Sequence, residues 1–180
     1  MKKRKTIIKF LVKFFAAYFV LLGIYSIYLK QTQQKSPVFS CSPITKTVAE
    51  HTEYVARLFG YPTSIQQSND ELSVIFFVGD VYAVPIVEGC NSISVIILFL
   101  SFIIAFAGSL KATIIFGILG SIAIYFINIL RILALSKLMY LYPEYQDILH
   151  NLFFPAIIYG AVFILWLIWV NRFSYLKKSR

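Results

Sequence analysis

The chain has 180 residues, of which 59% are hydrophobic and 14% are charged. Soluble domains average about 45–50% apolar and about 25% charged residues, so a soluble fold of this size could not cover so much apolar surface. The formal net charge of +9 could indicate nucleic-acid binding, but the basic residues gather beside the first and last apolar stretches, as they do at the cytoplasmic ends of membrane spans. The composition therefore predicts an integral membrane protein in contact with lipid and argues against nucleic-acid binding.

Four apolar stretches are long enough to cross a bilayer core, which takes about 20 residues of helix. The first, residues 7–29, follows basic residues as in a signal peptide but lacks a small-residue cleavage pattern, which favours a retained signal anchor. The other three are roughly residues 91–110, 112–135 and 152–170, with a tight turn at residues 108–111 between the second and third. We therefore expect about four transmembrane helices.

Charge also predicts the orientation of these helices. With the basic N-terminus inside, both termini and the turn at Lys111 are cytoplasmic, and residues 30–90 and 136–150 lie outside. All eight acidic residues fall in these two outer segments: Glu50, Glu53, Asp70, Glu71, Asp80, Glu88, Glu144 and Asp147. This distribution supports a multi-pass membrane protein with residues 30–90 and 136–150 on the outer side.

The chain divides into a signal-anchor span (1–29), an outer segment (30–90) and a membrane core (91–180). In the outer segment, apolar residues near helical spacing predict a short amphipathic helix over 44–59, with Val48, Val55, Leu58 and Phe59 on its apolar face. Two β-branched runs, 72–78 and 81–87, flank a Gly-Asp pair and predict a β-hairpin, whose second strand Pro85 confines to an edge. Residues 31–36 resemble a linker. The predicted fold is an all-α membrane protein with this small outer segment.

Helical phase places small and hydroxyl-bearing residues on one face of the second and third spans. Membrane helices use such stripes to pack closely together. The stripes are Cys90, Ser94, Ser101, Ala105 and Gly108, and Thr113, Gly117, Gly120, Ser121, Asn128 and Arg131. Packing explains most of both stripes, but it does not explain why one ends in a thiol and the other in a guanidinium.

Arg131 is the strongest single indication of a functional site. A charge inside an apolar span is costly, and such residues usually face the bundle interior and a functional partner. The alternative is an arginine that snorkels to the nearby outer surface. Asn128, one turn earlier on the same face, can hydrogen-bond toward Arg131.

His150 precedes the fourth apolar stretch. Pro143 suits the first turn of a helix and Glu144 and Asp147 suit its positive end, so we expect this helix to begin near Pro143 and to kink at Pro155. A lone interfacial histidine, like a lone cysteine, is more often structural than catalytic. Here, however, three helices each place one reactive group at the same outer level. Cysteine with histidine is a nucleophile–base pair, and a fixed cation can hold an oxyanion.

Cys41 has two interpretations, a free loop thiol or the partner of Cys90 in an outer disulfide. Two cysteines are too few for a disulfide framework or a zinc site, and we expect no metal or cofactor. Two rival functions stay open. The chain could be a non-catalytic membrane assembly subunit in which Arg131 pairs with an acid of a partner's span. It could also be a thiol oxidoreductase that uses Cys41 and Cys90, although it lacks a Cys-x-x-Cys pair.

Three sequence segments together resemble the exosortase/archaeosortase family, most closely its F branch. They are Glu88-Gly89-Cys90-Asn91-Ser92-Ile93 entering a span, Asn128-Ile129-Leu130-Arg131 near the end of the next span, and His150 opening another. The resemblance runs from about Leu72 to the end of the fourth span. Many members carry Ser-Gly or Ala-Gly after the cysteine, where this chain carries Asn91-Ser92.

The resemblance implies a membrane cysteine protease or transpeptidase. Such enzymes recognise a C-terminal signal made of a short motif, a transmembrane helix and a basic tail, and they cleave it at the outer face. The new carboxyl end can then be transferred to an acceptor. Carried over to this chain, the resemblance implies that Cys90 is the nucleophile, Arg131 the stabiliser of the oxyanion or thiolate, and His150 the general acid and base. The expected partner is a membrane-tethered protein with such a signal.

Overall fold

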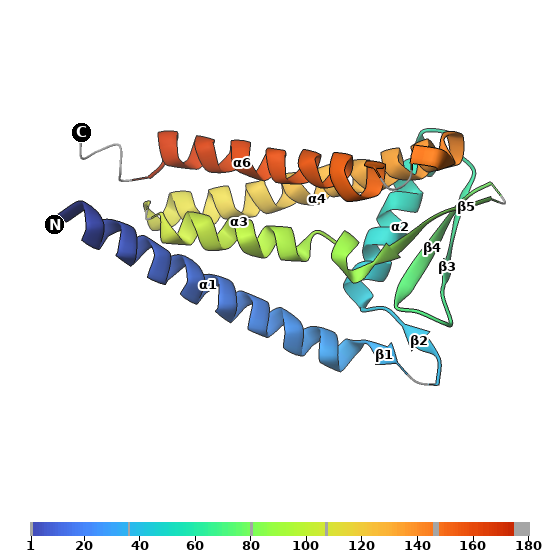
Figure 1. Ribbon diagram of the computed structural model, residues 1–180, viewed down its shortest axis with the longest axis horizontal. Helices are drawn as coiled ribbons and strands as arrows, with labels where there is room; N and C mark the ends of the chain where they lie inside the picture. The colour runs from blue at the N-terminus through green and yellow to red at the C-terminus, as the bar shows by residue number, and fades with distance from the viewer. Residues whose placement is uncertain (1, 36, 80, 107, 146–147, 175–180) are drawn as a thin grey trace. The chain divides into compact units, whose positions relative to one another are not determined.

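The computed structural model describes residues 2–35, 37–79, 81–106, 108–145 and 148–174 (Figure 1). The chain forms two compact units. The first comprises Met1–Ile27, Ile93–Ile124 and Tyr159–Arg180, and the second comprises Tyr28–Ser92 and Tyr125–Ile158. Helices α1 (Lys2–Thr32), α4 (Leu110–Leu141) and α6 (Phe154–Arg172) each contribute residues to both units.

The expected membrane helices are present. Within the described residues, three helical segments are long and apolar enough to cross a membrane: Arg4–Thr32, Leu110–Met139 and Leu149–Arg172. A fourth apolar helix, α3 (Ile93–Ala105), has 13 residues, or about 20 Å of helix, which is shorter than a full span. The predicted second span of residues 91–110 is therefore too long. Its first residues instead form an irregular turn in which Ser92 has a φ of 65°.

The third and fourth spans also differ in extent from the prediction. Helix α4 continues to Leu141 rather than ending at residue 135, because its later turns bury Ser136 and Met139 within the second unit. No single helix begins at Pro143: Pro143–Tyr145 form a 3₁₀ turn (η2), and α6 begins only at Phe154. Asp147 lies outside the described residues. A π-helical turn, η3 (Leu149–Phe153), precedes α6, as expected beside Pro155, which has no N–H and collides with the carbonyl four residues earlier.

Aromatic rings and glycines hold the helices of the first unit together. The rings of Phe10 and Phe106 have centroids 4.3 Å apart, and Phe102 stacks on Trp166 at 4.2 Å. Trp169 is fully buried and its indole N–H donates to the carbonyl of Phe106 at 3.0 Å. These contacts join α1, α3 and α6.

The small-residue stripe of α4 is a packing surface, as predicted. A Cβ placed on Gly120 would lie 2.3 Å from a ring carbon of Phe99, and one on Gly117 would lie 3.3 Å from Leu100. Gly117 and Gly120 thus let α4 approach α3 closely.

Gly120→Ala is therefore expected to destabilise the protein, lowering its unfolding free energy by about 1–3 kcal/mol, because the Phe99 ring must move to admit the methyl group. Gly160→Ala is the matched control. It is also a helical glycine, but nothing lies within 4 Å of its Cβ position, so alanine should be neutral or slightly stabilising. Thermal unfolding in detergent, followed by circular dichroism, compares the two. Equal melting temperatures would contradict this packing.

The second unit places helix α2 (Pro43–Leu58) against an antiparallel sheet of β3 (Thr63–Gln67), β4 (Ser73–Val78) and β5 (Val81–Val87) (Figure 1). The predicted hairpin is confirmed as β4 and β5, although Asp80 of its turn lies outside the described residues. The strand order β3-β4-β5 puts Pro85 on an edge, as predicted. Strand β3 was not predicted. Nor was the short pair β1 (Gln34–Lys35) and β2 (Phe39–Ser40), which begins inside the expected linker.

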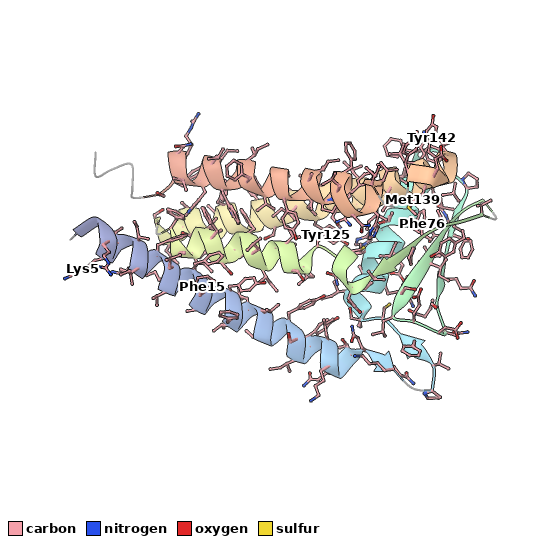
Figure 2. The ribbon with its side chains drawn as sticks, viewed as in Figure 1. Lys5, Phe15, Phe76, Tyr125, Met139 and Tyr142 are labelled. Carbon is pink, nitrogen blue, oxygen red and sulfur yellow. The ribbon has the colours of Figure 1, made fainter. Side chains whose placement is uncertain are left out.

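The buried face of helix α2 matches the predicted one only in part: Val48 is buried as predicted. Leu58 and Phe59, assigned to the apolar face, are 68% and 66% exposed. The buried residues of this helix are mostly small: Thr45, Val48, Ala49, Thr52 and Ala56. Small side chains let the helix lie close to the sheet. They join a core that includes Phe76, Cys90 and Met139, of which Phe76 and Met139 are labelled in Figure 2.

Candidate active site

Cys90 lies in a short turn between strand β5 and helix α3. Glu88–Cys90 form a single 3₁₀ turn (η1), and the cysteine side chain is 7% exposed. Two residues later, Ser92 adopts a left-handed backbone conformation with a φ of 65°, which costs a residue other than glycine about 1–2 kcal/mol. Strained residues of this kind gather at functional turns.

Helix α4 brings Asn128 and Arg131 to this turn. The Asn128 side-chain N–H donates to the carbonyl oxygen of Cys90 at 2.6 Å, and Arg131 Nη1 donates to Asn128 Oδ1 at 3.4 Å. Arg131 Nη2 lies 3.9 Å from Cys90 Sγ. The structure thus brings together three of the four predicted site residues, and the guanidinium faces the thiol. Their catalytic roles stay predictions.

The position of Arg131 along α4 matches the edge of a bilayer. Twenty residues separate it from Lys111 on the same helix, which is about 30 Å of helix and about the thickness of the hydrocarbon core. Arg131 Nε is buried and has no hydrogen-bond partner among the residues that the structure describes. The guanidinium therefore keeps an unused donor beside the thiol.

His150 is not joined to this group. It lies in the π-helical turn η3 with an exposed side chain, and its Nδ1 pairs with Asn151 Oδ1 at 3.1 Å. Within the described part of the chain it makes no hydrogen bond to Cys90 or Arg131. The structure therefore does not contain the direct contact expected between thiol and imidazole.

Glu88 is a polar residue of the site whose role the sequence did not reveal. Its carboxylate accepts hydrogen bonds from the Ser42 N–H at 2.7 Å, the Ser42 hydroxyl at 2.9 Å, the Asn91 amide at 3.1 Å and the Thr45 hydroxyl. Ser42 is also the N-cap of α2. Glu88 thus ties the start of α2 to the turn that carries Cys90. No local pattern could indicate this, because Ser42 and Thr45 lie more than 40 residues from Glu88 in sequence.

These hydrogen bonds also determine the ionisation of Glu88. Burial of the carboxyl raises its pKa, but the bonds from Thr45 and Ser42 lower it by more, so the pKa lies below the usual value for glutamate. Glu88 is therefore charged at neutral pH, beside the positive end of the α2 dipole.

Glu88→Gln is expected to lower the unfolding free energy by about 2–3 kcal/mol at pH 7, because its amide N–H₂ would face donors that now bond to a carboxylate. Since the folded-state pKa is lowered, this stabilisation is present above the unfolded pKa of about 4.3 and is lost as pH falls through the folded value. Thermal unfolding at pH 7 and pH 3.5 should show the difference shrinking at the lower pH. Glu50→Gln, which removes an exposed carboxylate of α2, is the control for the change in net charge. If both variants lower the melting temperature equally, Glu88 does not have this role.

Cys41 is a buried, free thiol, and so is Cys90, so no disulfide joins them in this structure. Burial, reinforced by the negative charge of Glu88, raises the pKa of Cys41 to about 11. This thiol is therefore protonated at neutral pH and a poor nucleophile.

The comparisons with known proteins identify the family. Residues 11–171 match the family model for the transmembrane exosortase (Exosortase_EpsH). The matched region includes the Cys90 turn, all of α3 and α4, and His150. The chain has no match among curated proteins or solved structures. With nearly the whole chain inside the family model, this membrane protein belongs to the transmembrane exosortase family.

Proposed function

We propose that this chain is a cysteine endopeptidase or transpeptidase of a bacterial inner membrane. It cleaves the C-terminal sorting signals of membrane-tethered exported proteins at the outer face of the membrane. The observation that carries the proposal is the 3.9 Å contact between Arg131 Nη2 and Cys90 Sγ, at a depth that matches the edge of the hydrocarbon core. Membership of the exosortase family supports a sorting-related role.

The contact supports a nucleophilic role for Cys90 because only the thiolate attacks carbonyls efficiently. Cys90 lies in the buried core of the second unit, where an anionic sulfur needs a group of opposite charge nearby. Arg131 supplies one that cannot lose its proton. Asn128 holds both partners, through the Cys90 carbonyl and through the guanidinium.

The reaction proceeds in two halves. The Cys90 thiol transfers its proton to His150, and its sulfur attacks the scissile carbonyl carbon. The carbonyl becomes an oxyanion stabilised by Arg131, whose Nε has no other partner among the described residues. As the C–N bond breaks, His150 returns the proton to the leaving amine, which leaves a thioester on Cys90. Water or an acceptor amine then attacks the thioester and releases the thiol.

This role requires His150 to approach the leaving amine when substrate binds. Its present partner is Asn151, on the same π-helical turn. Catalytic contacts often tighten only in the substrate complex, and π-helical turns occur frequently at functional sites. Both points support the assignment of His150 as the general acid and base.

The proposed orientation puts both termini and Lys111 in the cytoplasm. The segregation of all eight acidic residues into the predicted outer segments supports it. The Cys90 turn then faces the compartment into which the substrates are exported, with their transmembrane anchor held alongside in the bilayer.

Capture of the thioester by hydroxylamine tests the function. The protein is reconstituted in liposomes with a reporter fused to the tail of a genomic neighbour that ends in a short motif, an apolar run and a basic segment. Hydroxylamine should attack the thioester and leave a hydroxamate at the new C-terminus of the reporter, detected by mass spectrometry. Cleavage that yields only carboxylate at saturating hydroxylamine would argue for direct attack by water and against an acyl-enzyme.

The two histidines provide a matched pair for the same assay. His150→Gln should slow formation of the hydroxamate by about 100-fold or more, because the leaving amine then lacks a proton donor. His51→Gln should have little effect, since His51 pairs with Tyr125 at 2.7 Å and has no part in the proposed reaction. No cleavage by the wild-type protein of any such tail would favour a non-catalytic assembly subunit.

A further inference from the structure

The second unit contains a cavity that none of the proposed catalytic residues lines. Its volume is about 200 Å³, and its lining residues are Tyr61, Thr63, Val78, Leu133, Lys137 and Leu141. Leu133, Lys137 and Leu141 are spaced four residues apart on α4 and so share one helix face. The others come from the β3–β4 sheet and the segment that leads into it. The walls are mainly apolar, with a cation among them.

Hydrogen-bond donors outnumber acceptors in this cavity. Lys137 Nζ donates to the Tyr61 hydroxyl at 2.5 Å, so the phenol keeps its own O–H to donate elsewhere. Thr63 is only 7% exposed, and its hydroxyl has no hydrogen-bond partner among the described residues. A buried hydroxyl without a partner is rare in native proteins and indicates a missing ligand or water.

The side chain of Lys137 is exposed, and its charge has no carboxylate partner among the described residues. No carboxylate lies within 4.0 Å of its ammonium group in the described part of the chain, where the one such ion pair joins Arg57 and Glu53. The ammonium instead lies 4.8 Å from the centre of the Tyr61 ring. An ammonium with N–H donors to spare, the O–H of Tyr61 and the unpartnered hydroxyl of Thr63 are together complementary to an anion.

The depth of the cavity in the membrane indicates which anion. Lys137 follows Arg131 by six residues on α4, or about 9 Å of helix. With Arg131 at the edge of the hydrocarbon core, this distance spans the head-group layer, which is about 5–8 Å thick on each side of the bilayer. Tyr142 and Tyr145 are about half exposed just beyond it, as tyrosines are at membrane interfaces. Lys137 thus lies at the level of the lipid head groups.

We propose that this cavity binds a membrane phospholipid through the phosphate diester of its head group. Lys137, Tyr61 and Thr63 donate to the phosphate oxygens. The lipid chain leaves along Leu133, which is one turn nearer the membrane centre. The bound lipid joins the β3–β4 sheet to α4, and the site does not depend on the proposed peptidase activity.

The binding of dioctanoyl phosphatidylglycerol to the full-length protein in detergent tests this site. Native mass spectrometry gives the apparent Kd. Lys137→Gln should raise the Kd about tenfold, and Thr63→Val, which keeps the side-chain shape, about threefold. Lys46→Gln, at an exposed lysine of α2 in the same unit, should leave it unchanged. Equal Kd values for Lys137→Gln and Lys46→Gln would overturn the proposal.

Thr63→Val provides a second test, because its effect on the melting temperature should reverse when lipid is added. Without lipid, the methyl group replaces a buried hydroxyl that has no partner, so the variant should melt at the same or a higher temperature than the wild type. With saturating phosphatidylglycerol it should melt at a lower one. A variant that is less stable under both conditions would show that the hydroxyl has a structural role only, and would overturn the assignment.

Three further probes separate the possible ligands. Dioctanoylglycerol lacks the phosphate, inorganic phosphate lacks the chains, and a soluble acetylated peptide with two glutamates has neither. Each should bind at least tenfold more weakly than phosphatidylglycerol. If dioctanoylglycerol binds as tightly as phosphatidylglycerol, the cavity is apolar and does not recognise the head group. If inorganic phosphate does so, the cavity is a site for free phosphate. If the acidic peptide does so, the cavity is a peptide site. Each of these results would overturn the lipid assignment.

Discussion

Cys90→Ala is expected to reduce cleavage of a sorting-signal substrate by about 10⁴-fold or more, while the protein still inserts and folds. Alanine cannot form the thioester, and loss of a nucleophile removes most of the catalytic rate in enzymes of this kind. Cys90→Ser should retain little activity, because an alcohol is much harder to ionise than a thiol. The conversion of substrate is followed over time by mass spectrometry, and the melting temperature reports on folding.

Cys41→Ala is the matched control for this experiment. Cys41 and Cys90 are both free and almost equally buried, at 5% and 7% exposed, and both belong to the same core. Loss of either sulfur therefore perturbs packing to a similar degree. Cys41→Ala should process substrate at nearly the wild-type rate. If Cys90→Ala does so as well, the chain is not a peptidase, and the assembly-subunit hypothesis takes its place.

In the outer segment, some features of the fold could be predicted from residues that are adjacent in the sequence, and others could not. The β4–β5 hairpin was predictable because its β-branched runs and the Gly79 turn are adjacent in the chain. The buried face of α2 was predictable only in part: Val48 is buried as predicted, but the prediction ranked residues by hydrophobicity alone. Close packing of the helix on the sheet requires small side chains. Ala49 and Ala56 are therefore buried, and Leu58 is exposed.

The residues of the candidate site also differ in whether the sequence could predict them. Asn128 and Arg131 were predictable because helical phase places them on the packed face of α4, which leads to the Cys90 turn. The hydrogen bonds from Ser42 to Glu88 were not predictable, because only the tertiary fold brings these two residues together. The placement of His150 was missed for another reason. Capping rules predicted a regular helix from Pro143, whereas the chain forms separate 3₁₀ and π-helical turns.

Ser92 shows how the chain accommodates a departure from the family pattern. Many members of the resembled family carry glycine at the second position after the cysteine, and this chain carries Ser92 there. Here Ser92 has a φ of 65°, a conformation that glycine adopts without steric cost. The turn retains the left-handed conformation with serine, whose hydroxyl donates to the carbonyl of Asn91 at 2.6 Å.

The reactivity of the two thiols tests the role of Arg131. At pH 7, Cys41, with a pKa of about 11, is ionised in only about one molecule in 10⁴. Cys90 has the Arg131 guanidinium 3.9 Å from its sulfur, whereas the charged groups that act on Cys41 are the carboxylates of Glu88 and Glu71. We therefore expect Cys90 to react with a small neutral thiol reagent at least about 100-fold faster than Cys41, measured by mass spectrometry of the labelled peptides.

Substitution of Arg131 separates this electrostatic role from an arginine that only snorkels to the surface. Arg131→Ala should slow the labelling of Cys90 and so reduce the difference in labelling rate between the two thiols, whose burial is nearly equal. Part of the difference should remain, because the carboxylates of Glu88 and Glu71 still act on Cys41 alone. Arg131→Lys should insert normally yet lose about 10- to 100-fold in cleavage, because a flexible ammonium cannot contact Asn128 and the sulfur with the same fixed fork. A snorkelling arginine would tolerate lysine. Near-normal cleavage by Arg131→Lys, together with unchanged labelling of Cys90 in Arg131→Ala, would therefore remove Arg131 from the mechanism.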